Sequence, residues 1–226
     1  HGFTLNSTDV GSLANGINIW TVNNSYTGGQ PNVNCNLGGG TFPFPMSNTP
    51  NQPGGIANGP TSKYLHVVSA DANTQGVTNN NYLPSDGGTT CWNDETCFAR
   101  MTADVSTIGF TSVTLKFWWL CDGAANYSFG RLYYSTDQGI TWTQVTNPIS
   151  NFDTQASWTQ SSFTNAAWDN IPRLRFGFMF KVVNDLASAS LTPGFGVDDI
   201  SIVGTTAGGG SVTTAPLFSN GLCAGD

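Results

Sequence analysis

The chain has 226 residues, of which 9% are charged and 12% are aromatic, and Glu occurs once, at position 95. Helical surfaces usually carry many Glu and Lys residues, so a chain rich in Asn, Thr, Ser and Gly indicates β-strands joined by turns. The net charge of −7 and the seven basic residues exclude nucleic acids and anionic lipid surfaces as partners, because both require clustered Lys and Arg. No stretch reaches the roughly 20 apolar residues of a membrane span.

Alternation of apolar and polar residues predicts the strands, since no segment keeps a 3.6-residue period. Residues 111–121 are the clearest case, because Val113, Phe117 and Cys121 take one face while the partly apolar Trp118 and Leu120 take the other. We expect this strand to be central and covered on both sides. The further expected strands are 17–22, 64–68, 98–103, 130–135, 141–145, 174–183 and 195–203.

This pattern predicts an all-β fold, a jelly-roll β-sandwich of two antiparallel sheets with long N-terminal loops, over residues 1–203. Residues 27–60 hold most of the Gly, Pro and Asn and are expected to form a long excursion pinned by Phe42 and Phe44. Residues 204–214 are rich in Gly, Thr and Ser and predict a linker. Residues 215–226 are expected to begin a following domain or to form a terminal strand.

Asp198 and Asp199 lie next to each other in an expected strand, where neighbouring side chains point to opposite faces. They therefore cannot both flank one glycosidic bond, and one carboxylate is expected to point toward the side of Ile200 and Ile202. A structural calcium ion would neutralise that charge, while a hydrogen-bonded strand Asp is the alternative. Weaker candidate ligands for calcium are Asp71, Asp122 and Asp185.

Residues 135–142 match the Asp-box pattern S-x-D-x-G-x-T-W. Asp137 can accept hydrogen bonds from turn amides, Gly139 supplies a permissive backbone, and Trp142 can pack under the hairpin. Sialidases carry this motif repeatedly as a turn remote from the active site, so we expect a structural turn here.

Sugar rings stack on exposed aromatic faces, and the chain has seven Trp residues. Trp119 and Trp142 are expected in the core. The candidate ligand platforms lie beside loops and polar residues, and these are Trp92, Trp158 and Trp168.

The five cysteines include Cys91 and Cys97, which enclose a short polar loop. A disulfide between these two would fit an extracellular protein, with two free thiols as the alternative. The pairing of Cys35, Cys121 and Cys223 stays open.

Catalytic machinery is not expected. The histidines are His1, at the chain end, and His66, in an expected strand, and neither lies in a nucleophile-elbow or zinc-protease motif. The cysteine spacing is not that of a zinc site.

Four segments occur in an order that resembles the MAM-like jelly-roll modules of secreted, multidomain Bacteroidota proteins. They are Leu115-Lys-Phe-Trp-Trp119, Gly130-Arg-Leu-Tyr-Tyr-Ser-Thr-Asp137 with Gly139-Ile-Thr-Trp142, Leu174-Arg-Phe-Gly-Phe-Met-Phe180, and Phe195-Gly-Val-Asp-Asp-Ile200. The resemblance covers residues 60–203. The tail, Ala215-Pro-Leu-Phe with Leu222-Cys-Ala-Gly-Asp226, resembles the first strand of a PKD repeat, which would place Cys223 in the next domain.

The resemblance implies a secreted or cell-surface product, often exported by type IX secretion and associated with gliding motility, with structural calcium near the Asp-Asp-Ile strand. It implies a non-catalytic adhesion or structural module whose partners are surface glycans, other cell-surface proteins or following domains of its own chain. The alternatives are a carbohydrate-binding module attached to a secreted enzyme and a subunit of an extracellular filament, in which residues 212–218 would complete a neighbour's sheet.

Overall fold

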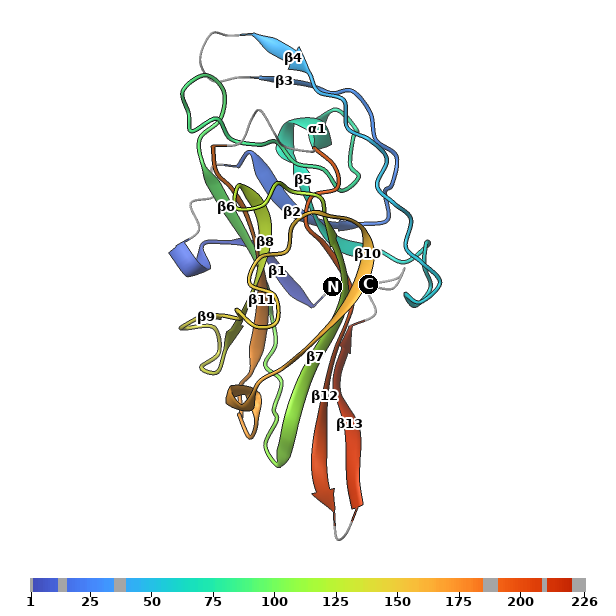
Figure 1. The fold of residues 1–226 in the computed structure, drawn as a ribbon, viewed down its shortest axis with the longest axis vertical. Helices are drawn as coiled ribbons and strands as arrows, with labels where there is room; N and C mark the ends of the chain where they lie inside the picture. Colours follow the sequence, from blue (N-terminus) through green and yellow to red (C-terminus); the bar gives the residue numbers. More distant parts are fainter. Residues whose placement is uncertain (1, 12–15, 35–39, 185–190, 209–210, 221–226) are drawn as a thin grey trace.

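Two antiparallel β-sheets pack face to face in the computed structural model, which describes residues 2–11, 16–34, 40–184, 191–208 and 211–220 (Figure 1). Side chains are described up to residue 206. The predicted all-β sandwich is thereby confirmed. Among the described residues, no helix has the length and apolar character needed to cross a membrane.

The first sheet has the strand order β1-β6-β11-β8-β9. Its strands are β1 (Phe3–Ser7), β6 (Glu95–Met101), β11 (Arg175–Val182), β8 (Ser128–Ser135) and β9 (Thr143–Gln144). The second sheet has the order β10-β7-β12-β5-β2, and β13 pairs with β12 outside this path. Its strands are β10 (Gln155–Thr164), β7 (Phe110–Cys121), β12 (Gly196–Gly208), β5 (Tyr64–Ser69), β2 (Asn18–Asn23) and β13 (Ser211–Asn220).

From β5 onward the chain changes sheet at nearly every connection: β5, β7, β10 and β12 lie in the second sheet, whereas β6, β8, β9 and β11 lie in the first. Each sheet is therefore assembled from strands that are distant in sequence. The jelly-roll connectivity stays a prediction, and this alternation favours it.

The main core lies between the sheets and is largely aromatic. The predicted inward face of β7 is confirmed, because Val113, Phe117 and Cys121 are completely buried in this core. The rings of Phe117 and Phe163 stack with centroids 5.4 Å apart, so β10 is anchored to β7 by side chains as well as by backbone pairing. β10 is not among the strands expected from the sequence, because polar residues occupy most of its positions and leave no clear alternation of apolar and polar residues.

The outer face of the second sheet is also covered, as predicted for β7. Ile56, Tyr64 and Leu120 form a buried cluster there together with Trp158, and Trp118 packs against it. The cover is the long N-terminal excursion, which runs over this face of the sheet (Figure 1). The excursion is therefore pinned mainly by this cluster.

A small arm lies at one end of the sandwich, formed by β3 (Asn32–Asn34) and β4 (Thr41–Pro43) beside helix α1 (Ala70–Thr74) (Figure 1). A separate buried cluster fills the space beneath it and includes Val33, Leu83 and Trp92. Phe44 packs against this cluster, as predicted, whereas Phe42 is 49% exposed, so the prediction that Phe42 pins the excursion is wrong. The remaining short helices are η1 (Asp9–Gly11) and η2 (Ala166–Trp168).

The linker predicted over 204–214 is wrong in its local structure. β12 continues to Gly208, and Ser211–Asn220 form β13, which pairs antiparallel with β12 of the same chain. Gly and Thr residues paired in a ladder look the same in sequence as a flexible linker, which explains the error. Residues 215–220 lie within β13, and their assignment to a terminal strand or to the start of a following domain stays a prediction. The strand donation of the filament alternative would need this segment to leave its own sheet.

Candidate functional site

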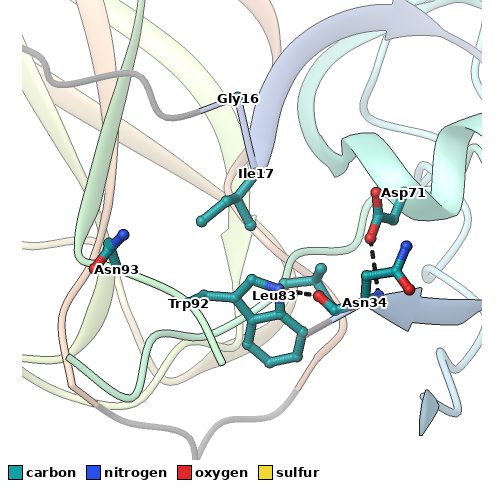
Figure 2. Close-up of a pocket in the computed structure, with 7 residues that line it drawn as sticks. All are labelled: Gly16, Ile17, Asn34, Asp71, Leu83, Trp92 and Asn93. Carbon is teal, nitrogen blue, oxygen red and sulfur yellow. Dashed lines mark hydrogen bonds between the residues drawn. The ribbon is translucent and has the colours of Figure 1, made fainter. Parts of the chain in front are cut away.

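A pocket of about 450 Å³ opens at the end of the sandwich that carries the β3–β4 arm. Its size lies within the range of pockets that bind small molecules, which is roughly 300–1,000 Å³. It is lined by Gly16, Ile17, Asn34, Asp71, Leu83, Trp92 and Asn93 (Figure 2).

The pocket combines an apolar floor with a polar rim. Leu83 and Trp92 are buried, whereas the side chains of Asn34 and Asn93 are exposed and that of Asp71 is partly exposed. Two carboxamides and one carboxylate therefore offer hydrogen-bond donors and acceptors around the partly exposed side chain of Ile17, with Leu83 and Trp92 packed beneath.

Trp92 is held in place from two sides. Its indole Nε1 donates to the backbone oxygen of Asn34 at 3.0 Å, and its ring meets that of Phe44 edge to face with centroids 5.3 Å apart. The backbone N–H of Asn34 donates in turn to Oδ2 of Asp71 at 3.2 Å (Figure 2). One strand of the arm is thus fixed to both the floor and the rim of the pocket.

Asp86 organises the loop that presents Trp92 and Asn93. Its carboxylate accepts hydrogen bonds from the backbone N–H groups of Gly88, Thr90 and Cys91, at 3.0, 2.8 and 2.7 Å. Burial alone would raise the pKa of Asp86, but these amide donors bring it below its usual value. The loop is therefore built around an ionised carboxylate that does not face the pocket.

Glu95 fixes the opposite wall, which carries Ile17. Its two carboxylate oxygens accept from the backbone N–H groups of Ile17 and Asn18 at 3.0 and 2.8 Å. Burial raises the pKa of Glu95 to about 7, although these two amides favour the ionised form. The single Glu of the chain is thus a buried anchor for the start of β2.

The prediction that Trp92, Trp158 and Trp168 are exposed ligand platforms is wrong. Their exposed fractions are 3%, 9% and 0%. Trp158 donates from Nε1 to the backbone oxygen of Pro50 at 2.9 Å, and Trp168 packs edge to face on Phe176 in the main core. Trp92 contributes to the pocket as part of its floor, held inward by the arm, which sequence proximity to polar residues could not reveal.

The predicted Cys91–Cys97 disulfide is wrong as well. Cys97 is free and buried in the main core, whereas Cys91 is disulfide-bonded and packs in the cluster beneath the arm. Cys121 is also free and buried, so the partner of Cys91 lies outside the described residues. The two cysteines are six positions apart but serve different clusters, because Cys97 belongs to β6 and Cys91 to the loop before it.

The prediction that the side chains of Asp198 and Asp199 point to opposite faces of β12 is wrong. The pairing of β12 with β7 shifts register between Asp198 and Ser201, and Asp199 has a φ of 47°. This bulge interrupts the alternation of side chains, so both carboxylates bond to the excursion. Asp198 accepts from the side-chain amide of Gln52, and Asp199 accepts from the backbone N–H of Ala57 at 2.7 Å.

Burial raises the pKa of Asp198 to about 7, since the residue is 1% exposed, and the neighbouring charge of Asp199 also raises it. Its neighbours Gln52 and Ser62 are joined by a hydrogen bond of 3.1 Å from the Ser62 hydroxyl. A carboxylate in this setting would be stabilised by a bound cation or by protonation.

The other predicted calcium ligands are not gathered at Asp198. Asp198 pairs with Trp118, whereas Asp122 lies four residues further along the chain, just past the end of β7, about 13 Å away at the usual strand rise. Asp71 belongs to the pocket, and Asp185 lies outside the described residues. The described part of the chain contains no group of three or more His, Cys, Asp or Glu side chains placed to hold a metal ion. It therefore does not assemble the carboxylate-rich site that calcium prefers, and calcium binding at Asp198 stays a prediction.

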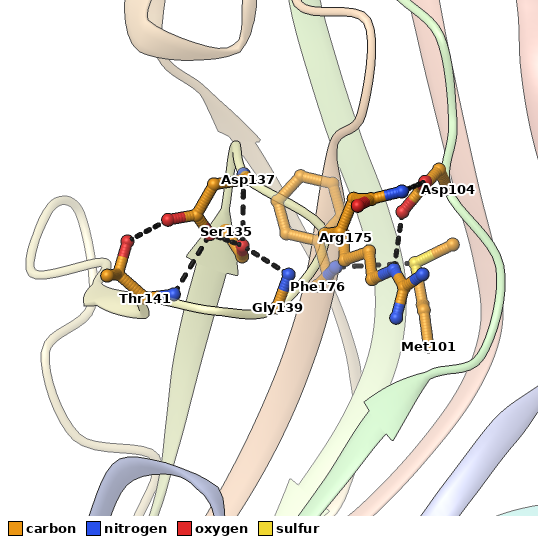
Figure 3. A network of polar contacts seen from close by, with 9 residues as sticks. Met101, Asp104, Ser135, Asp137, Gly139, Thr141, Arg175 and Phe176 are labelled. Atoms are coloured by element: carbon orange, nitrogen blue, oxygen red, sulfur yellow. Dashed lines mark hydrogen bonds and ion pairs between the residues drawn. The ribbon is translucent and has the colours of Figure 1, made fainter.

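The Asp-box forms the turn between β8 and β9 (Figure 3). Asp137 accepts from the backbone N–H and the hydroxyl of Thr141 at 2.9 and 2.6 Å, and the N–H of Gly139 donates to the hydroxyl of Ser135 at 2.8 Å. The Thr141 donors and the Ser135 hydroxyl lower the pKa of Asp137 to about 2. Trp142 is half-buried beneath this turn and packs on Phe98 on the outer face of the first sheet, so it lies outside the main core where it was expected.

The turn is joined to the first sheet through Asp104, which accepts hydrogen bonds from Gln138 and from Arg175 on β11 (Figure 3). The hydrogen bonds of Ser135 and Asp137 stay within the turn, as the predicted structural role requires. His66 is likewise a buried strand residue, with its ring nitrogens 2.9 Å from the backbone oxygen of Val67 and from Oδ1 of Asn23.

Comparison of the sequence with models of known protein families and with curated proteins found no match.

Proposed function

We propose that this chain is a non-catalytic recognition module of a secreted or cell-surface protein, and that it mediates adhesion by binding neutral glycans in the pocket at the β3–β4 arm. The observation that carries the proposal is the rim of Asn34, Asp71 and Asn93 above the floor of Leu83 and Trp92. A sugar presents hydroxyl groups at its edge and C–H groups on its faces. The polar rim offers partners for the hydroxyl groups, and the partly exposed Ile17 offers an apolar contact for a C–H face.

Charge selects among glycans. The chain carries a net charge of −7, and Asp71 places a carboxylate on the pocket rim. Both features repel uronic and sialic acids, because like charges oppose association at close range. We therefore infer that the ligand is a neutral sugar.

The disulfide at Cys91 supports the proposed location. Disulfides persist in oxidising compartments, which include the bacterial periplasm and the cell surface. Cys91 directly precedes Trp92, so the bridge stabilises the loop that forms part of the pocket.

Binding to arrays of neutral and acidic glycans, followed by titration calorimetry, tests this function. We expect neutral glycans to bind. We expect Asp71→Ala to weaken binding by at least about tenfold, since hydrogen bonds involving a charged group contribute roughly 1.5–3 kcal/mol, and Asn93→Ala to weaken it about two- to tenfold, since neutral hydrogen bonds contribute roughly 0.5–1.5 kcal/mol. Asn126→Ala, a change at an exposed turn outside the pocket, is the matched control. Binding to acidic glycans alone, or binding unaffected by both pocket variants, would refute the proposal.

A further inference from the structure

Phe42 on the β3–β4 arm is a large apolar side chain that the fold leaves in water. It is 49% exposed, and the other large hydrophobic side chains exposed in the described parts of the chain are Ile108, Tyr127 and Ile140. Of these four residues, Phe42 is the one whose strand pairs with an element that lines the pocket, because β4 pairs with β3 and β3 contributes Asn34.

The register of the arm shows which face Phe42 takes. Phe42 pairs with Val33, and residues directly opposite each other in an antiparallel pair share a face. Val33 is completely buried in the cluster that contains Trp92. Phe42 therefore lies on the face of the arm that is turned toward the floor of the pocket.

Phe44 lies between Phe42 and Trp92 along this face of the arm. The ladder of the arm continues past β4, because the N–H of Phe44 donates to the backbone oxygen of Pro31 at 3.0 Å and Met46 bridges to Gly29. Phe44 and Phe42 are two residues apart in this extended segment, so they share a face at a spacing of about 7 Å. Phe44 contacts Trp92 directly, with ring centroids 5.3 Å apart.

Trp92 and Phe44 are thus in ring contact, and Phe42 follows at the next position on the same face of the arm, with its ring packed beside Gly40. We call these three residues the aromatic row. Their exposure increases along the row, from 3% at Trp92 through the half-buried Phe44 to 49% at Phe42. Core packing accounts for the first two rings, but it does not account for Phe42, whose ring lies half in water. Pro43 and Pro45 flank Phe44 and stiffen this segment, so the Phe42 ring is presented on a restrained backbone.

We propose that the aromatic row is a second part of the glycan site, so that the ligand is an oligosaccharide chain that occupies the pocket and continues over Phe42. This inference rests on the proposed function, and it adds the length and direction of the ligand. The polar rim binds one end of the chain by hydrogen bonds, while Phe42 packs against the C–H face of a later sugar. Such a ring offers contact area at little conformational cost, because its position is set before the ligand arrives.

The test compares short and long ligands on the intact chain. The probes are the disaccharide and the hexasaccharide of cellulose, mannan, xylan and chitin, measured by titration calorimetry with the wild type, Phe42→Ala and Phe42→Trp. We expect the hexasaccharide of the preferred glycan to bind more tightly than its disaccharide, and Phe42→Ala to weaken hexasaccharide binding about three- to tenfold while disaccharide binding is unchanged. Phe42→Trp should retain the preference for the long ligand.

Tyr127→Ala provides the matched control, because Tyr127 is 46% exposed and does not line the pocket. Equal affinities for short and long ligands, together with no effect of Phe42→Ala, would overturn the inference and leave the pocket as a site for one end of a glycan. Failure of every probe to bind would overturn the proposed function and the inference together. Since Phe42 is exposed, its replacement is not expected to unfold the protein, and the melting temperature of each variant checks this.

Discussion

Replacing Asp198 by Asn in the presence of EDTA is expected to stabilise the protein at pH 8 and to leave its stability nearly unchanged at pH 4. Asp198 is a buried carboxyl group whose pKa is raised by burial to about 7, against an ordinary value of 3.8. Asn has nearly the same shape and cannot ionise. The side-chain amide of Gln52 can reverse its orientation to accept from Asn, with the Ser62 hydroxyl turning to accept in its place.

The direction of this pH dependence follows from the number of protons that the folded and unfolded states bind. Between pH 3.8 and 7 the unfolded chain has released the Asp198 proton while the folded protein still holds it, so folding stability falls as the pH rises through this range and is level above it. The difference between the two pKa values corresponds to about 4 kcal/mol, at about 1.36 kcal/mol for each pH unit. Asp198→Asn removes this loss, so its advantage at pH 8 is expected to approach about 4 kcal/mol.

Denaturant unfolding of the wild type and the variant at pH 4, 5, 6, 7 and 8 measures the effect. Comparing the two proteins at each pH isolates Asp198, because Glu95 and His66, with pKa values of about 7 and 4, contribute equally to both. A difference in free energy of unfolding between variant and wild type that does not change with pH would refute the reasoning. The same pair of proteins tests calcium: if the ion binds Asp198, calcium must stabilise the wild type and not the variant.

Three further predictions concern other parts of the chain. Asp86→Ala removes the acceptor of three backbone amides and is expected to lower the free energy of unfolding by about 2–3 kcal/mol, as denaturant unfolding would measure. The same variant is expected to bind glycans more weakly in titration calorimetry. Unchanged affinity would show that the loop does not depend on this carboxylate. Gly139→Ala forces a side chain onto a residue with a φ of 87° and within 3.2 Å of Trp142, so we expect a loss of about 1–2 kcal/mol, and an unchanged melting temperature would contradict it. Cys97 and Cys121 are buried thiols with raised pKa values, and we expect iodoacetamide to label them only after denaturation, as mass spectrometry of the peptides would show; rapid labelling of the native protein would argue against their burial.

Much of the sandwich can be predicted from the sequence, because the alternation of apolar and polar residues along a strand reflects which of its faces is buried. A strand with one face in the core must place an apolar residue at every second position, and β7 does so from Val113 to Cys121. The Asp-box turn is equally local, since the hydrogen bonds of Ser135 and Asp137 join residues no more than four positions apart. Such features need no knowledge of the remainder of the chain.

The pocket could not be predicted in this way, because its residues come from five separate parts of the sequence. Asn34 and Trp92 are 58 positions apart, and only the folded arm brings the indole to its backbone acceptor. The expectation that Trp92 is exposed relied on its polar sequence neighbours, whereas its burial is decided by a strand that those neighbours do not reveal.

The sequence alone determined the all-β class, the principal strands, the Asp-box turn and the acidic balance that disfavors anionic ligands. These depend on residue composition and on contacts within a few positions. Only the tertiary structure decided that Cys97 is free, that a bulge directs both Asp198 and Asp199 to the excursion, and that Phe42 rather than Trp92 is the exposed ring beside the pocket. Each of these outcomes depends on which distant segment covers a side chain, and that is a property of packing between strands far apart in the chain.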